Sequence, residues 1–214
     1  MKEIAARLGV SPGSVHLWTV DIQIAPEHSA RNRRVGAKLR GENWKELNRQ
    51  RRLAYQREGR SRARQGDALH EAGCMLYWAE GSKKRNTVAF SNSDLHMVCF
   101  FKRFLTQCFE FKPASLTLRL NVYTGNGLSV RAIEDYWLRA LKLPRTCLRG
   151  HTLNHMPTSS SGRKKNRLPY GVCTLRLNDT GIVQHIYGAI QEYAGFEEPR
   201  WLDGPPRKPR EKAT

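Results

Sequence analysis

The chain has 214 residues, which is enough for one domain of medium size and a small additional module. Its 37 Lys and Arg against 19 Asp and Glu give a net charge of +18, which favours a polyanionic partner, nucleic acid ahead of an anionic membrane surface. Apolar runs are too short for a membrane span or a signal peptide, which excludes an integral membrane protein. The five scattered cysteines form no C-x-x-C pair, which excludes a disulfide framework. We therefore expect a cytoplasmic location.

Residues 1–24 are predicted to form two short helices joined by a tight turn. Gly9 would end the first helix and Ser11 would cap the second. Ala5, Gly9 and Val15 fit the helix-turn-helix pattern of a small residue where the helices touch, a turn glycine and an apolar anchor. The segment is therefore interpreted as a small all-α helix-turn-helix.

Residues 25–65 are predicted to be a basic helical linker. From residue 29 to residue 64 there are 13 Lys or Arg and three acidic residues. Such a helix is either a solvated charged segment or an arm that follows DNA phosphates, and the excess of one sign favours the arm. A helix-turn-helix packs against a further helix, which either residues 44–55 or a segment upstream of Met1 would supply.

Residues 66–197 are predicted to form the main domain, of α+β class, and residues 198–214 a disordered basic tail. Apolar residues in this domain recur with helical period in some segments and alternate in others. In chain order, the expected elements are a helix over 67–80, short strands over 83–86 and 87–91, a helix over 93–109, a strand over 115–123, a helix over 130–141, a basic loop over 149–167, a strand over 171–177 and a helix over 181–194.

The most informative segment is EAGCMLYWAEGSK, where the helix over 67–80 closes in Glu80 and Gly81. Gly81 would allow a sharp turn from helix into strand. Small and apolar residues on one face of this helix would let two helices approach closely. That face is formed by Ala72, Gly73, Leu76 and Ala79.

This segment resembles the motif of the LAGLIDADG homing endonucleases, in which a helix ends in Asp/Glu-Gly before a hairpin. It also looks like bacterial and phage proteins, actinobacterial ones among them, that join a helix-turn-helix to a segment like LYWAEGSK. The resemblance covers residues 66–195 in layout, and in the letters of the motif only the stretch from Gly73 to Gly81. Tyr77 and Trp78 depart from the aliphatic and acidic residues that are common in the family.

The resemblance implies an α-β-β-α-β-β-α saddle that binds double-stranded DNA. Family members with a single motif act as homodimers, in which the two motif helices pack together and their terminal acids hold divalent metal above the DNA. Carried over, this makes Glu80 the catalytic and metal-binding residue, with Mg²⁺ as cofactor, and makes Ala72, Gly73, Leu76 and Ala79 the dimer helix. The expected function is metal-dependent cleavage of DNA, and the alternative is a transcription regulator of the same fold that does not cleave.

Further candidates for DNA contact lie on the exposed faces of strands, in the basic loop and on the second helix of the helix-turn-helix. These residues are Ser14, His16, Lys83, Lys84, Arg85, Arg119, Asn121, Arg149, Arg163, Lys165, Arg167, Thr174 and Arg176. Lys164 is the candidate catalytic lysine near the scissile phosphate. The competing interpretation of the loop is a solvated segment, and RNA binding is a third class of function for the same basic surface.

Two weaker patterns remain. Cys147, His151 and His155 recur at four-residue spacing, which suggests either zinc ligands or a histidine base, although no fourth ligand is evident. Trp78 and Trp137, with Tyr136, are candidates either for base stacking or for core packing, and packing is favoured. Nothing in the sequence indicates a small-molecule substrate.

Overall fold

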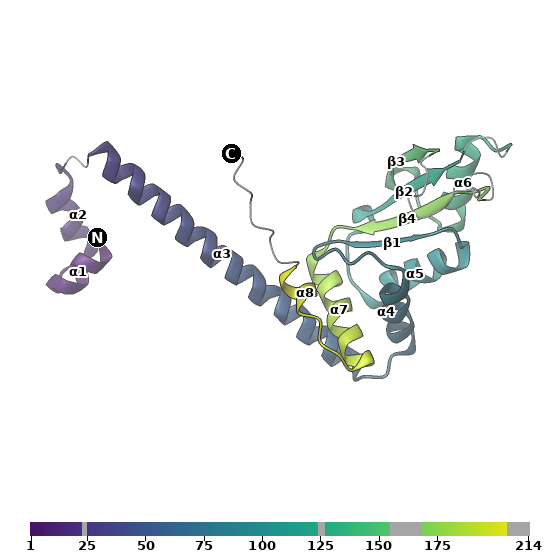
Figure 1. Ribbon diagram of the computed structural model, residues 1–214, viewed down its shortest axis with the longest axis horizontal. Coiled ribbons are helices and arrows are strands. Elements are labelled where there is room, and N and C mark those ends of the chain that lie inside the picture. Colours follow the sequence, from purple (N-terminus) through teal and green to yellow (C-terminus); the bar gives the residue numbers. More distant parts are fainter. Residues whose placement is uncertain (23–24, 124–126, 155–167, 205–214) are drawn as a thin grey trace, which may run out of the picture. The chain divides into compact units, whose positions relative to one another are not determined.

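A computed structural model of the chain describes residues 1–22, 25–123, 127–154 and 168–204 (Figure 1). It divides into an N-terminal unit, Met1–Leu47, and a main unit, Asn48–Thr214. The main unit thus begins earlier than the expected residue 66, because the C-terminal part of the predicted linker belongs to it. Among the described residues, no helix combines the length and the apolar character needed to cross a bilayer.

The N-terminal unit contains the two predicted short helices, α1 (Lys2–Leu8) and α2 (Pro12–Thr19). Gly9 ends α1 in the left-handed region, with φ 67°. The Ser11 hydroxyl accepts a hydrogen bond from the backbone N–H of Ser14 at 3.0 Å, as expected of a helix cap. Ala5 and Val15 are the side chains that the two helices bury.

The predicted linker is one helix, α3 (Pro26–Ala63), and its C-terminal part packs on α7 (Thr180–Ala194) within the main unit. A Cβ atom on Gly59 would lie 2.0 Å from the carbonyl oxygen of His185, and one on Gly188 would lie 2.0 Å from the carbonyl oxygen of Gln56. The two helices therefore meet backbone to backbone, which these glycines alone permit.

Arginines in this part of α3 bind partners within the chain rather than remaining free for phosphate. The ion pairs, with their N···O distances, are Arg49–Asp203 at 2.8 Å, Arg60–Glu197 at 2.7 Å, Arg62–Asp67 at 2.7 Å and Arg64–Glu192 at 2.7 Å. The Arg52 guanidinium also donates to the carbonyl oxygen of Leu202 at 2.8 Å. The prediction of an arm that follows phosphates is thus wrong for these arginines.

Two of these partners belong to α8 (Pro199–Asp203), in the segment predicted to be a disordered tail from residue 198. Leu202 is buried, and the side chain of Gln191 accepts a hydrogen bond from the backbone N–H of Glu198 at 2.9 Å. The tail prediction is therefore wrong for residues 198–204, because α8 covers α7 and satisfies arginines of α3.

The main unit is α+β, as predicted, with a mixed sheet of four strands. The strands are β1 (Val88–Asn92), β2 (Leu116–Val122), β3 (Leu148–Leu153) and β4 (Val172–Leu177). Their order is β1-β4-β2-β3, where β4 is antiparallel to β1 and β2, and β3 is parallel to β2. Two expectations fail: residues 83–86 form no strand, and β3 lies where the loop over 149–167 was predicted.

Both failures have physical reasons. Within residues 83–86, the Arg85 side chain donates to the carbonyl oxygen of Asp203, and the Arg85 carbonyl oxygen accepts from the Gln184 side chain. The segment is therefore hydrogen-bonded to helices α7 and α8. Its pairing with the sheet is limited, among the described residues, to a bridge between Gly81 and Phe90. Strand β3 has no alternating pattern because it is an edge strand with mostly exposed side chains.

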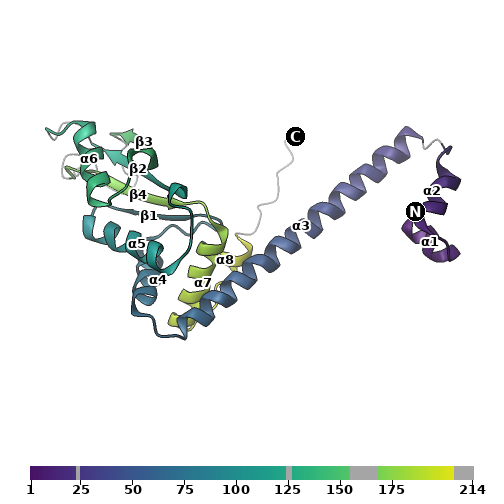
Figure 2. The same ribbon diagram turned by 180° about the vertical axis from the view of Figure 1, so that it is seen from behind.

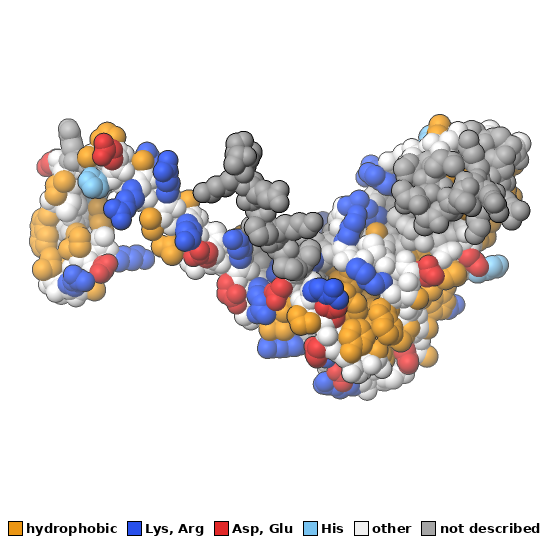
Figure 3. Space-filling view, in the orientation of Figure 1, with side chains coloured by type: hydrophobic (Ala, Val, Ile, Leu, Met, Phe, Trp, Pro, Cys, Tyr) orange, Lys and Arg blue, Asp and Glu red, His pale blue; other side chains and the backbone are white. Residues whose placement is uncertain are grey.

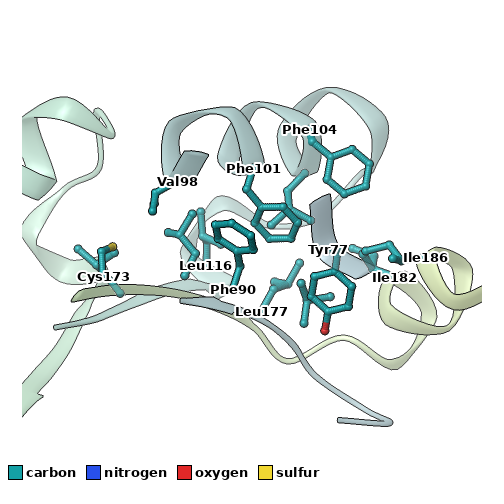
Figure 4. Packing of buried hydrophobic residues seen from close by; sticks show 14 of the residues in the cluster. Tyr77, Phe90, Val98, Phe101, Phe104, Leu116, Cys173, Leu177, Ile182 and Ile186 are labelled. Atoms are coloured by element: carbon teal, nitrogen blue, oxygen red, sulfur yellow. The ribbon is translucent and has the colours of Figure 1, made fainter. Parts of the chain in front are cut away.

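Helices α4 (Ala68–Glu80), α5 (Leu95–Cys108) and α7 cover one face of the sheet, and both views show them on the same side (Figures 1 and 2). In the core between them, the ring of Phe101 stacks on that of Phe90, with centroids 4.4 Å apart, and on that of Tyr77, at 5.7 Å (Figure 4). Trp137 of α6 (Val130–Ala140) is fully buried, as core packing predicts, and its indole N–H donates to the carbonyl oxygen of Tyr170. Tyr136 stacks on the Tyr170 ring.

Candidate nucleic-acid interface

The face of the sheet opposite these helices carries polar and basic side chains. Along β2 and β4, apolar side chains are buried on the helix side, and every second residue points the other way. We call this surface the open face and define it by Ser91, Thr117, Arg119, Asn121, Thr174 and Arg176. Four of the predicted DNA-contacting residues, Arg119, Asn121, Thr174 and Arg176, therefore share one surface, as the alternation in the sequence predicts.

The strand register arranges the open face in cross-strand rows. One row places Ser91, Thr174 and Arg119 side by side on β1, β4 and β2, and the next places Arg176 beside Thr117. The hydroxyls of Ser91 and Thr174 lie 2.8 Å apart, and the Arg176 guanidinium donates to the side-chain oxygen of Asn178 at 3.0 Å. Hydroxyl groups and arginines thus alternate across neighbouring strands.

The two open-face arginines form no ion pair with the residues that the structure describes. Of the ion pairs formed within the described part of the chain, none includes Arg119 or Arg176. In this they differ from the paired arginines at the end of α3. The side-chain oxygen of Asn121 is buried without a hydrogen-bond partner in the described structure, so this amide has unused hydrogen-bonding capacity.

Lys83, a predicted DNA contact, instead turns back to the end of α4. Its ammonium donates to the carbonyl oxygens of Trp78 at 2.6 Å, Gly81 at 2.9 Å and Tyr77 at 3.3 Å. Burial lowers the pKa of Lys83, and the nearby carboxylate of Glu80 opposes this effect. The ammonium therefore compensates the negative end of the helix, and the DNA contact of Lys83 stays a prediction.

The next two residues have different surroundings. Lys84 is exposed to solvent, as Lys83 is. Arg85 is half-buried and donates to the carbonyl oxygen of Asp203 at 2.6 Å, which ties it to α8. Gly81 has φ −75°, so it is not needed for an unusual backbone angle; a Cβ there would lie 2.3 Å from the Tyr77 ring, and lack of space requires the glycine.

Glu80 is exposed at the last position of α4. Magnesium binds carboxylate and carbonyl oxygens, and the carbonyl oxygens beside Glu80 already accept hydrogen bonds from Lys83. No group of three or more His, Cys, Asp or Glu suited to a metal ion occurs among the described residues. Within one chain, the residues around Glu80 therefore do not fit Mg²⁺.

The predicted dimer helix divides between the interior and the surface. A Cβ on Gly73 would lie 2.1 Å from the Phe104 ring, so this glycine serves the approach of α5 within the same chain, and its assignment to a dimer contact is wrong. Leu76 is partly buried against the core, whereas Ala72 and Ala79 are exposed. Figure 3 shows hydrophobic side chains gathered where α4, α7 and α8 reach the surface. Trp78 of α4 is 38% exposed, and its ring lies against that of Phe196.

The other residues predicted to contact DNA lie outside the open face. In the N-terminal unit, Ser14 is half-buried with its hydroxyl 3.0 Å from that of Ser11, and His16 is exposed. Arg149 is exposed on β3. The loop residues Arg163, Lys164, Lys165 and Arg167, together with His155, lie outside the described residues.

An ionic cluster at α6 was not predicted from the sequence. Glu134 is buried and pairs with Arg145, which also pairs with Asp135 and lowers the pKa of that carboxyl group. His151 Nδ1 lies 3.2 Å from Glu134 Oε1, so the carboxylate orients the imidazole. The sequence does contain a signal for this cluster, because Glu134 occupies a position on the apolar face of an amphipathic helix. A buried carboxylate requires charged or hydrogen-bonding partners, so such a position predicts an ion pair.

A buried histidine pair between α4 and α7 was also not predicted. The Nε2 atoms of His70 and His185 lie 3.0 Å apart, and His70 Nδ1 lies 2.9 Å from the Tyr193 hydroxyl. Burial lowers the pKa of both histidines, that of His185 to about 4, and the adjacent His70 lowers it further. Both imidazoles are thus neutral near pH 7, and the pair is part of the core.

Comparison of the chain with models of known families, with curated proteins and with solved structures gives no match. The function must therefore be inferred from the chemistry of the open face and of the end of α4.

Proposed function

We propose that the chain binds double-stranded DNA through the open face of its sheet. The observation that carries this proposal is the placement of Arg119 and Arg176 among the hydroxyls of Ser91 and Thr174, where neither arginine pairs with a carboxylate of the described residues. Arginine contacts phosphate and guanine, and hydroxyl groups contact either phosphate or bases. The net charge of +18 supports the same class of partner.

A strand surface suits this role because the major groove, about 12 Å wide, admits a pair of β-strands. We further propose that the main unit is a variant of the LAGLIDADG-type saddle, with α4 as the motif helix behind the sheet. The exposure of Ala72, Ala79 and Trp78 on α4 supports a homodimer formed through this helix. The N-terminal helices would add a second DNA contact and raise the effective concentration at the site.

A homodimeric endonuclease that uses Mg²⁺ at Glu80 is the second candidate, supported by the exposure of Glu80 at the end of α4. The contact between Lys83 and the neighbouring carbonyl oxygens favours binding without cleavage, as in a transcription regulator. Supercoiled plasmid incubated with protein and Mg²⁺ or Mn²⁺ is expected to remain intact. Nicking that disappears in Glu80→Gln would establish the endonuclease instead.

The open face is tested by removing its two arginines. Arg119→Gln combined with Arg176→Gln is expected to weaken binding to a random-sequence duplex about tenfold at 100 mM salt, and to make the dependence of log K on log salt shallower by about 2, because two phosphate contacts are lost. Fluorescence anisotropy between 50 and 200 mM salt measures both quantities.

The matched control is Lys102→Gln combined with Arg103→Gln, which removes the same charge from α5 on the opposite face of the sheet. If both double variants lose equal affinity, net charge alone explains binding and the open face is not the interface. Stronger competition by structured RNA than by duplex DNA would point to an RNA-binding protein.

A further inference from the structure

The two arginines of the open face differ in how their side chains are held. Arg119 is exposed, and its guanidinium donates to none of the residues that the structure describes. Arg176 is half-buried, and its Nε–H donates to the side-chain oxygen of Asn178 at 3.0 Å. The same oxygen accepts a hydrogen bond from the Thr87 hydroxyl at 3.2 Å. Thr87 thus holds Asn178, and Asn178 holds Arg176.

This chain of hydrogen bonds limits the directions open to the Arg176 guanidinium. The strand register places Arg176 between Ala89 of β1 and Thr117 of β2, so the small side chain of Ala89 leaves room on one side. Because the Nε–H is already bonded, the two terminal nitrogens, Nη1 and Nη2, remain as a parallel pair of donors at the far end of the group. Within the described part of the chain, this pair has no acceptor.

We infer that Arg176 reads a guanine base, that Asn178 is its positioning residue, and that Arg119 contacts phosphate. This inference rests on the proposed binding of DNA by the open face. In the major groove, guanine presents its O6 and N7 acceptors side by side, and two parallel arginine donors match them. A phosphate contact requires positive charge but no fixed direction, which suits the exposed Arg119.

The difference in order between the two arginines has an energetic consequence. A long side chain loses conformational entropy when it is immobilised at an interface. The bond from Asn178 has already removed part of this freedom from Arg176, so Arg176 loses less than Arg119 would on binding a base. A paired contact also depends on direction, because a rotated guanidinium meets only one of the two acceptors. The held arginine is therefore the one suited to base recognition.

Selection of bound duplexes from a randomised DNA library tests the assignment without knowledge of the target site. The wild-type chain is expected to enrich guanine at one or more positions. In a selected duplex, 7-deazaguanine at the position read by Arg176 should weaken wild-type binding about tenfold, because a carbon replaces the N7 acceptor. Arg176→Lys keeps the charge without the paired donors and should bind both duplexes equally. Arg119→Gln should weaken binding to both and leave their ratio unchanged.

The role of Asn178 is tested by the same ratio of affinities, which a general loss of binding does not alter. Asn178→Ala is expected to lower the ratio about threefold, the cost of immobilising one freed side chain. Asn178→Asp retains an acceptor oxygen and should retain the ratio, although its negative charge weakens binding to every duplex. The matched control is Asn86→Ala, which removes an exposed amide next to Thr87 and should behave as the wild type.

The outcomes separate this inference from the proposed function. Duplex binding that enriches no guanine, or an equal ratio in wild type and Arg176→Lys, would overturn the assignment of Arg176 while leaving DNA binding established. An unchanged ratio in Asn178→Ala would show that the Asn178 contact does not position the arginine. Absence of any duplex binding by the wild-type chain would overturn both the proposed function and this inference.

Discussion

Replacing Gly59 with alanine is expected to destabilise the main unit by about 3 kcal/mol, although alanine ordinarily favours a helix over glycine by about 1 kcal/mol. The added methyl group would lie 2.0 Å from the carbonyl oxygen of His185, in the backbone of another helix, so α3 and α7 would have to separate. Urea unfolding of the full chain, followed by circular dichroism, measures the change.

Gly41 provides the matched control, since it lies in the same helix and a Cβ there meets nothing within 4 Å. Gly41→Ala is expected to leave the unfolding midpoint of the main unit unchanged or to raise it slightly. Equal, small effects of the two substitutions would show that α3 does not dock on α7 through this contact.

Lowering the pH from 7.5 to 5.0 is expected to reduce the free energy of unfolding by about 2 kcal/mol through His185 alone. Burial holds the pKa of His185 near 4 in the folded chain, against about 6.5 for an unfolded histidine. Between these values the unfolded chain binds more protons than the folded one, so stability is present above pH 6.5 and is lost as the pH falls toward 4. His70, whose pKa is also lowered, adds to the same loss.

Chemical denaturation at a series of pH values checks this result. His185→Gln should flatten the dependence between pH 6.5 and 4.5, whereas His96→Gln, at an exposed position of α5, should not. The carboxyl groups whose pKa is lowered by arginine partners, such as Glu192 and Glu198, lose their stabilising effect only at lower pH. An unchanged slope in His185→Gln would mean that the histidine is accessible to protons in the folded chain.

The sequence predicted the fold class and most helices and strands because these depend on local periodicity. The alternation of β2 and β4 correctly assigned Arg119 and Arg176 to the exposed surface of the sheet. The start of α2 was also predicted, because the Ser11 side chain caps the backbone there.

What the sequence could not predict depends on contacts between distant residues or on side-chain direction. Gly59 and Gly188 are separated by more than a hundred residues, so the docking of α3 has no local signature. Lys83 and Lys84 are adjacent, chemically identical and both exposed, yet the Lys83 ammonium donates to the end of α4. Its direction depends on the backbone, which Tyr77 and Tyr187 fix through hydrogen bonds to the carbonyl oxygens of Ser82 and Lys84.

The backbone contact between α3 and α7 has a consequence for biosynthesis. The C-terminal part of α3 is translated more than a hundred residues before Gly188, yet its buried side chains Arg52 and Gln56 have their partners in α7 and α8. A ribosome adds about 5–20 residues per second, so this stretch stays uncovered for several seconds while the sheet is still being made. The first-made part of the main unit is therefore the last to be completed, and nascent chains that stall before α7 would expose it to chaperones and proteases.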